Sequence, residues 1–299
     1  MKIVQSFWSK PFMHSESFLV DSRINGGWPH RILHYYSCAL SCLRLREFYE
    51  DVELITDDLG KEIMIDKMKL PFTYVRLALN DMQHVPAGLW TLGKVYSYGI
   101  QEVPFLHIDN DVFIGNKFED TIMESGLIAQ NAEMKTPGNA HTLREMCESF
   151  TGMPSYVQDL LHYKYTPNCN AGIIGGHDID FFRAYSKDVF SVLNANIDKI
   201  NDSLHYMNAA HVSVILEQVF FYAYAGYSGH DIKYLFPDTD DFPADIGFFH
   251  ASPENKHFVH CFGFYKKIRG VYSMVEKTLK TIYPDYYQRI NDLVNYLEL

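Results

Sequence analysis

The chain has 299 residues, of which 47% are hydrophobic and 21% are charged, as in ordinary soluble globular proteins. Its 26 lysines and arginines against 37 aspartates and glutamates give a formal net charge of -11. This balance argues against a nucleic-acid binder, because neutralising phosphates requires a basic face. An anionic ligand remains compatible with the chain if a metal ion and one or two lysines act locally, since salt screens charges beyond roughly 8 Å.

Few features of the sequence bear on its location. The N-terminal apolar run is too short for a secretory signal, and no stretch of about 18 apolar residues predicts a transmembrane helix. We therefore expect a cytoplasmic protein, with peripheral contact at the inner membrane face left open. The five cysteines lack the Cys-x-x-Cys spacing of zinc sites, so we expect reduced structural thiols: Cys38, Cys42, Cys147, Cys169 and Cys261.

Strands and helices are predicted to alternate over the first 110 residues, which indicates βαβ units and a mainly parallel sheet. In an open α/β sheet of this kind, ligands bind beyond the carboxyl ends of the strands. The predicted elements are a strand at 2–7, a helix at 30–49, strands at 52–56 and 72–77, a helix over 89–99 and a strand at 103–108.

The second half of the chain continues the α/β pattern less regularly. Residues 132–168 are polar and rich in Pro, Gly and Thr, so we expect a mobile loop or a small helical excursion there. The other predicted elements are strands at 126–131, 169–174, 248–250 and 258–260, and helices at 178–194, 212–223, 271–282 and 286–297, the last two separated by Pro284. We expect one α/β domain over 1–268 and a helical extension over 269–299 that packs on it.

The most informative motif is Asp109-Asn110-Asp111, which directly follows the apolar strand 103–108. On extended backbone, alternating side chains would point both acids the same way, where they could share a divalent cation. Asp-x-Asp is a short pattern, and the chain also contains Asp178/Asp180 and Asp238/Asp240. Only the strand context singles out the first pair, for which the alternative is a solvated turn.

Three later segments gain meaning together with this pair: the strand from Asn170 to Gly176, the pair Glu217-Gln218, and the run from His260 to Lys266. In this order they resemble the GT-A nucleotide-sugar glycosyltransferases, particularly the family 8 type that includes glycogenin and the bacterial galactosyltransferases. The resemblance spans roughly residues 1–266 through sparse motifs. A closer resemblance to an uncharacterised bacterial family with the same motifs adds no function.

The resemblance implies a metal site and a diphosphate contact. Asp109, Asp111 and His260 would hold Mn²⁺, or Mg²⁺, although an imidazole beside carboxylates suits Mn²⁺ better. Lys266 would stabilise the departing diphosphate, and Gly263 would let the backbone approach the ligand closely. The alternatives are a core histidine at His260 and a solvated basic run at Lys266.

The resemblance also implies residues around the donor sugar. Asn170 and Gln218 would hydrogen-bond the sugar or position the acceptor, and Lys94 would contact the donor. Glu217 stands where the family usually has Asp, which leaves its role as the carboxylate near the anomeric carbon open, and it could instead be a polar position on an amphipathic helix.

The expected nucleotide contacts are weaker. Phe7 or Trp8, at the end of the first strand, could stack on the uracil base, and Asp57 after the second strand is another candidate contact. His30 and His34 are expected on a helix surface, and Asp178 is expected to cap a helix.

Together these features predict a metal-dependent glycosyltransferase. It would move a sugar from a UDP-sugar donor to a glycan or lipid-linked acceptor, with retention of anomeric configuration if the family 8 likeness holds. A metal-dependent hydrolase that uses the same Asp, Asp and His side chains, and a non-catalytic nucleotide or sugar binder, are the alternatives. The tyrosine-rich C-terminal helices could dock on a membrane or acceptor, but packing on the domain is preferred.

Overall fold

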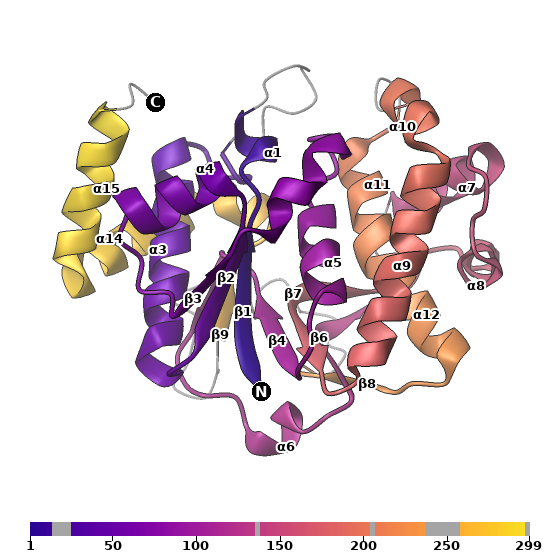
Figure 1. Ribbon diagram of the computed structural model, residues 1–299, viewed down its shortest axis with the longest axis horizontal. Coiled ribbons are helices and arrows are strands. Elements are labelled where there is room, and N and C mark those ends of the chain that lie inside the picture. The colour runs from indigo at the N-terminus through magenta and orange to yellow at the C-terminus, as the bar shows by residue number, and fades with distance from the viewer. Residues whose placement is uncertain (14–24, 135–137, 204–206, 237–257, 297–299) are drawn as a thin grey trace. The chain divides into compact units, whose positions relative to one another are not determined.

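The computed structural model describes residues 1–13, 25–134, 138–203, 207–236 and 258–296 (Figure 1). The chain divides into two compact units that are both discontinuous in sequence. Unit 1 contains Met1, Asp81–His107 and Asp120–Asp238, and unit 2 contains Lys2–Asn80, Ile108–Glu119 and Thr239–Leu299. The predicted boundary at residue 268 stays a prediction.

Unit 2 is built on parallel strands. The order is β3 (Tyr74–Arg76), β2 (Val52–Thr56) and β1 (Lys2–Phe7), with Ile3 opposite Val52. Every residue of β2 is buried, as expected for a strand with neighbours on both sides. The helix α3 (Arg31–Phe48) lies between β1 and β2 in the sequence, as a βαβ crossover requires.

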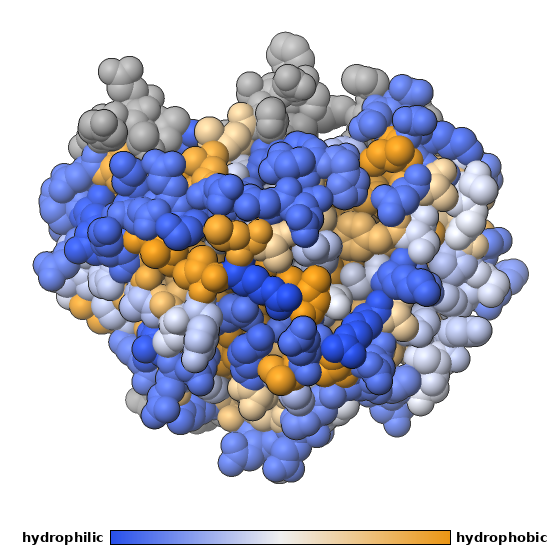
Figure 2. Space-filling model, in the orientation of Figure 1, coloured by the Kyte–Doolittle hydropathy of each residue, from blue (hydrophilic) through white to orange (hydrophobic). Residues whose placement is uncertain are grey.

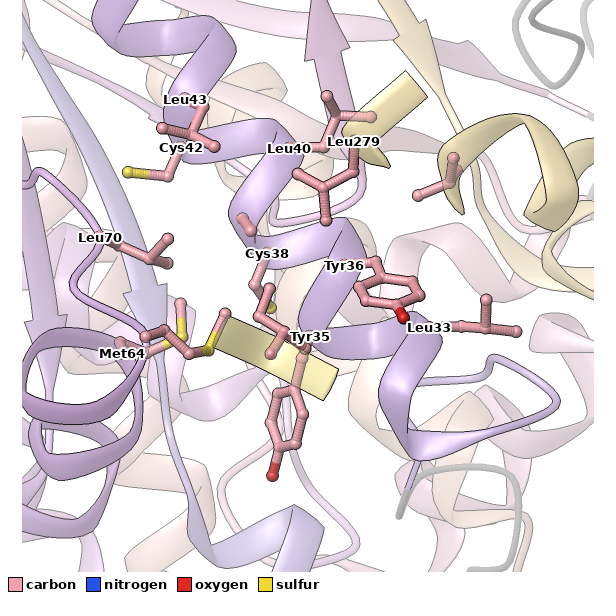
Figure 3. Packing of buried hydrophobic residues seen from close by; sticks show 14 of the residues in the cluster. Leu33, Tyr35, Tyr36, Cys38, Leu40, Cys42, Leu43, Met64, Leu70 and Leu279 are labelled. Carbon is pink, nitrogen blue, oxygen red and sulfur yellow. The ribbon is translucent and has the colours of Figure 1, made fainter. Parts of the chain in front are cut away.

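The core of unit 2 surrounds α3, twelve of whose residues are buried. Helices α14 (Arg269–Ile282) and α15 (Pro284–Tyr296) pack against α3, and the three lie side by side (Figure 1). Figure 3 shows Leu279 of α14 close to Leu40 of α3 in this apolar cluster. The C-terminal helices are therefore part of the hydrophobic core of unit 2.

Unit 1 has a mixed sheet. The order is β4 (Phe105–Ile108, of which Ile108 is assigned to unit 2), β7 (Asn168–Gly176), β6 (Leu127–Glu133) and β8 (Ile232–Tyr234). Strand β6 is antiparallel to β7 and parallel to β8. Helices α5 (Leu92–Gly99) and α9 (Ile179–Ala195) pack against each other. The two units thus confirm the α/β fold class with mainly parallel and mixed pairing.

The remaining elements are short. In unit 2 they are α1 (Lys10–Met13), α4 (Asp58–Lys61), the π-helix η1 (Glu62–Lys67), β5 (Val112–Ile114), β9 (Phe258–His260) and the 3₁₀ helix η6 (Gly263–Lys267). The 3₁₀ helix η2 (Ala78–His84) crosses the boundary between units, and unit 1 adds α6 (Asp120–Met123), α7 (Asn139–Ser149), α8 (Ser155–Gln158), η3 (Asp159–His162), α10 (Ile197–Ser203), α11 (Ala209–Val214), η4 (Ile215–Val219) and α12 (Phe220–Ser228).

Most predicted elements are confirmed, and the differences have local causes. Of the two expectations for 132–168, the helical excursion is confirmed in the described part of this segment, which contains α7, α8 and η3. The predicted helix 212–223 belongs to a longer helical run interrupted by the π-turn η4. Pro284 begins α15, a position that suits proline because the first helical residue needs no N–H partner. The predicted strand 248–250 lies outside the described residues.

Figure 2 shows that hydrophilic residues cover most of the face drawn, with hydrophobic residues in scattered groups between them. In the part of the chain that the structure describes, no helix is both long and apolar enough to cross a bilayer.

Candidate metal site

The acidic pair sits in a tight turn of unit 2 between β4 and β5. The Val112 amide donates to the Asp109 carbonyl at 3.1 Å, so the extended backbone expected for Asp109-Asn110-Asp111 is wrong. Asn110, between the acids, fixes the turn: its Nδ2 donates to the Ser6 carbonyl at 2.8 Å, and its own carbonyl accepts from Ser37 Oγ at 2.7 Å. The acids are therefore oriented by a turn whose backbone is held from β1 and α3.

His260 reaches the acidic pair through the short antiparallel ladder of β5 and β9. Val112 pairs with His260, and the Cys261 amide donates to the Asp111 carbonyl at 3.0 Å. This register places His260 Nε2 3.3 Å from Asp111 Oδ1. One ligand atom from each of Asp109, Asp111 and His260 lies within 4.8 Å of the other two. The structure thus brings together three residues that the sequence predicts as metal ligands.

Lys266 lies at the same site. Its Nζ is 2.5 Å from Asp111 Oδ2 and donates to the Gly26 carbonyl at 2.7 Å, and it lies 5.6 Å from the centroid of the Trp28 ring. Gly263, with φ of 51°, starts the 3₁₀ turn that carries Lys266, and this left-handed backbone favours glycine. The contacts of Lys266 with Gly26 and Trp28 were not predicted from the sequence, because no local pattern links residues about 240 positions apart.

The charged groups of the site change the pKa values of their neighbours. Burial alone would raise the pKa of the Asp111 carboxyl, but the Lys266 ammonium and then His260 outweigh it and hold that pKa well below its usual range. The pKa of nearby His34 is also lowered, to about 3, by burial and then by the Lys266 ammonium. Asp111 is therefore an anion and His34 a neutral ring at neutral pH.

The donor set fits a divalent cation. Two carboxylates and an imidazole are ligands that Mn²⁺ accepts, and two ligand atoms at about 2.0–2.2 Å from one ion lie roughly 3.0–3.4 Å apart. The separation of 3.3 Å between Asp111 Oδ1 and His260 Nε2 falls in this range. Asp111 Oδ1 is also buried without a hydrogen bond of good geometry, as are Asn110 Oδ1 and Gln5 Oε1. Asp111 can therefore offer Oδ1 to an ion while Oδ2 pairs with Lys266.

In unit 1, Glu217 is the centre of a second buried network. Its Oε1 lies 2.8 Å from Lys94 Nζ and accepts from Tyr98 OH at 2.8 Å, while its carbonyl accepts from Tyr185 OH at 2.7 Å. Lys94 also donates to the Ala171 carbonyl at 3.1 Å. The lysine and acid that the sequence predicts near the donor sugar are thus direct partners of each other.

The other predicted sugar contacts also lie in unit 1. Asn170 Nδ2 donates to Glu133 Oε1 at 2.9 Å, and Asn170 Oδ1 accepts from the Gly172 amide at 2.9 Å. Gln218 is half-buried, beside Glu217 in η4. Asn170 is thereby fixed in orientation by contacts at both ends of its amide.

The residues predicted to contact the nucleotide lie in unit 2, where Phe7 and Asp57 have partners within the chain. Phe7 and Trp8 are buried, and the Phe7 ring stacks on Phe12 with centroids 5.1 Å apart. Asp57 Oδ1 accepts from the Gly60 amide at 2.7 Å, and its Oδ2 accepts from Ser9 Oγ at 2.8 Å. Asp57 therefore caps α4 and holds the end of β1, a structural role that its sequence position did not reveal.

Several alternative interpretations can now be corrected. Lys266 is buried rather than part of a solvated basic run, and Glu217 is buried rather than a polar surface position. His34, expected on a helix surface, is buried, whereas His30 is exposed. Asp178 caps α9 as expected, because its Oδ1 accepts from the Phe181 amide at 3.0 Å.

A family model described as "Family of unknown function (DUF6734)" matches residues 1–293. A comparison with curated proteins finds no match.

Similar solved structures include three glycosyltransferases. Apo mouse xyloside xylosyltransferase 1 is 9% identical, with a TM-score of 0.38, over 78% of this chain and 84% of that one. Glycosyltransferase GlyE of Streptococcus pneumoniae TIGR4 is 9% identical, with a TM-score of 0.45, over 97% of this chain but 63% of that one. The galactosyltransferase LgtC, in complex with donor and acceptor sugar analogs, is 11% identical, with a TM-score of 0.45, over 97% and 100%. Similarities at this level leave the function to be inferred from the site itself.

Proposed function

We propose that this chain, which belongs to a family of unknown function (DUF6734), is a metal-dependent glycosyltransferase. It would move a sugar from a UDP-sugar to a hydroxyl on a glycan or lipid-linked acceptor. The observation that carries the proposal is the meeting of Asp109, Asp111 and His260 with the buried ammonium of Lys266. A divalent cation beside a fixed lysine is suited to a diphosphate, which needs positive charge on several oxygens.

We propose two roles for the residues of this site: three would hold the metal ion, and Lys266 would contact the departing diphosphate. Asp109, Asp111 and His260 would hold Mn²⁺, which when bound would neutralise negative charge on the leaving group. Lys266 is oriented by Asp111 and the Gly26 carbonyl, so its ammonium would meet phosphate oxygens without first being ordered. Such preorganised charge is effective because the groups need not rearrange as negative charge develops.

Unit 1 supplies the residues that we propose for the sugar. Lys94 and Tyr98 hold the Glu217 carboxylate, so Glu217 would act as a fixed anion beside the sugar rather than as a mobile base. Asn170 and Gln218 would hydrogen-bond sugar hydroxyls or orient the acceptor. Retention of configuration follows only from the family 8 resemblance and belongs to this proposal.

A thermal-shift titration and a donor-hydrolysis assay test the proposal. We expect UDP to raise the melting temperature when Mn²⁺ is present, more than either ligand alone, and UDP-sugars to be hydrolysed slowly in a Mn²⁺-dependent reaction. Asp111→Asn should abolish both effects. Asp180→Asn is the matched control, because Asp180 belongs to another Asp-x-Asp pair and its side chain is 92% exposed.

Three outcomes would contradict the proposal. Retained UDP stabilisation and hydrolysis in Asp111→Asn would remove the metal site from the reaction. Stabilisation by Mn²⁺ without any response to UDP would favour a metal-dependent hydrolase of another substrate. Binding of UDP-sugars to the wild type with neither hydrolysis nor transfer to acceptor glycans would identify a non-catalytic binder.

A further inference from the structure

Lys266 occupies the position of an internal counter-ion. Its Nζ is 2.5 Å from Asp111 Oδ2, and its side chain is 11% exposed, so the pair is shielded from bulk water. A charge pair in such surroundings interacts more strongly than one on the surface. Asp111 is thus neutralised by the chain itself.

The turn from Gly26 to Trp28 holds the lysine in place. Gly26 and Gly27 have φ angles of 61° and 84°, and the Gly26 carbonyl accepts from Lys266 Nζ at 2.7 Å. A Cβ on Gly27 would lie 3.3 Å from Lys266 Cδ, so the side chain runs along the glycine backbone. The buried Trp28 ring faces the ammonium at 5.6 Å, within cation–π distance. Lys266 therefore has three partners in addition to solvent: a carboxylate, a carbonyl and an indole.

This arrangement opposes a second cation. A metal bound to Asp111 Oδ1 would share that carboxylate with the ammonium on Oδ2, and like charges only a few ångströms apart repel. A diphosphate would reverse the effect, because its oxygens can contact both cations at once.

We propose that Lys266 weakens metal binding to the ligand-free site and couples it to the binding of a diphosphate, so that the cation and the nucleotide bind cooperatively. This inference rests on the proposed function and adds the regulation of its metal site. Lys266 then acts in two opposite ways: it competes with the metal for Asp111 and supports the anion that the metal needs. Removing the ammonium should separate the two effects.

Isothermal titration of Mn²⁺, with and without UDP, tests the proposal in the full chain. For Lys266→Met we expect Mn²⁺ alone to bind roughly tenfold more tightly than to the wild type. The gain in Mn²⁺ affinity on adding UDP should be smaller in the variant than in the wild type. Lys267→Met is the matched control, because Lys267 is exposed on the same turn, and it should behave as the wild type.

Thermal melting with and without Mn²⁺ is a second test, because Lys266→Met leaves Asp111 buried and unpaired and so should destabilise the metal-free fold. Without metal, Lys266→Met should melt at a lower temperature, and Mn²⁺ should raise its melting temperature more than that of the wild type. Equal or weaker binding of Mn²⁺ to Lys266→Met, or an equal thermal response, would overturn the inference.

The two proposals fail in different ways. If the wild type binds Mn²⁺ but UDP has no effect, the glycosyltransferase proposal and the coupling both fail, whereas competition between Lys266 and the metal survives in the tighter binding of the variant. If UDP and Mn²⁺ act together equally in both proteins, the glycosyltransferase proposal stands and the role of Lys266 is wrong.

Discussion

Two carboxylates at strand ends of unit 2 serve different purposes. Both carboxylate oxygens of Asp57 accept hydrogen bonds within the chain, one from the Gly60 amide at the start of α4 and the other from Ser9. Asp111 pairs one oxygen with Lys266 and leaves the other without a hydrogen bond of good geometry. The first arrangement stabilises the fold, and the second leaves one carboxylate oxygen that the proposed metal ion could contact.

Replacing Asp57 should therefore reduce stability. Asp57→Ala removes a helix cap and two hydrogen bonds to Ser9, which we expect to cost about 1–3 kcal/mol in the free energy of unfolding. Urea unfolding measures the loss, with the exposed neighbour Asp58→Ala as the control. A variant as stable as the control would show that these bonds contribute nothing, and a specific loss of UDP affinity would restore Asp57 as a nucleotide contact.

At this scale the sequence predicts residue types better than their partners. The resemblance to the GT-A glycosyltransferases implied a cluster of Asp109, Asp111, His260 and Lys266, and the structure brings these four residues together. The resemblance could not reveal that Lys266 also bonds the Gly26 carbonyl, because that contact depends on the path of the whole chain.

Close strand packing governs the elements of unit 1. Gly175 of β7 lies so near β4 that an added Cβ would be 2.1 Å from the Phe105 carbonyl oxygen. Backbone cannot move away as a flexible side chain can, so β4 and β7 require glycine here. From the sequence, Gly175-Gly176 indicates only the end of a strand. The close approach of β7 to β4 cannot be predicted from the sequence, because it depends on where the neighbouring strand lies.

Gly175→Ala should thus be strongly destabilising. We expect a loss of at least about 2 kcal/mol, because the strands must separate to accommodate the methyl group. Gly226→Ala in α12 is the matched control: its Cβ meets nothing within 4 Å, and alanine favours helix, so its stability should be unchanged or slightly higher. Thermal melting compares the two, and equal stabilities would contradict the packing argument.

Elements with strong periodicity were predicted within a few residues, as at β1, β2 and α3. The π-turn η4 was not, because a single inserted residue in a helix leaves no composition signal. The turn at Asp109-Asn110-Asp111 was not predicted either, because it depends on hydrogen bonds of Asn110 with the Ser6 carbonyl of β1 and with Ser37 of α3.

At the scale of the whole molecule, the two compact units cannot be recognised from the order of residues along the chain, because each unit is made of separate segments. Unit 2 takes residues from three separate stretches, so its candidate metal site combines Asp111 with His260, which most of unit 1 separates in the sequence. Composition and periodicity identify the α/β class but not this interleaving, since both units have the same kinds of element. The division of the chain is a property of long-range contacts.

Stability should fall in mild acid because histidines are buried in neutral form. The pKa of His34 is about 3 in the folded chain against an ordinary value of 6.5, so the unfolded state binds more protons between these values. Its contribution is present above pH 6.5 and is lost as the pH falls; at pH 5 the loss is about 2 kcal/mol. Burial lowers the pKa of His107 in the same direction.

Urea unfolding at pH 7 and pH 5 measures this dependence. His34→Gln should lose less stability between the two pH values than the wild type, whatever its stability at pH 7. An equal loss in both proteins would show that His34 is protonated without cost in the fold.

The most direct test of the proposed metal site is a crystal structure with Mn²⁺ and UDP. We predict one ion, identified by anomalous scattering, bound by Asp109, Asp111 and His260 at about 2.0–2.4 Å, with Lys266 Nζ contacting a phosphate oxygen. Bound UDP with no ion at these three side chains, or an ion held elsewhere, would contradict the account.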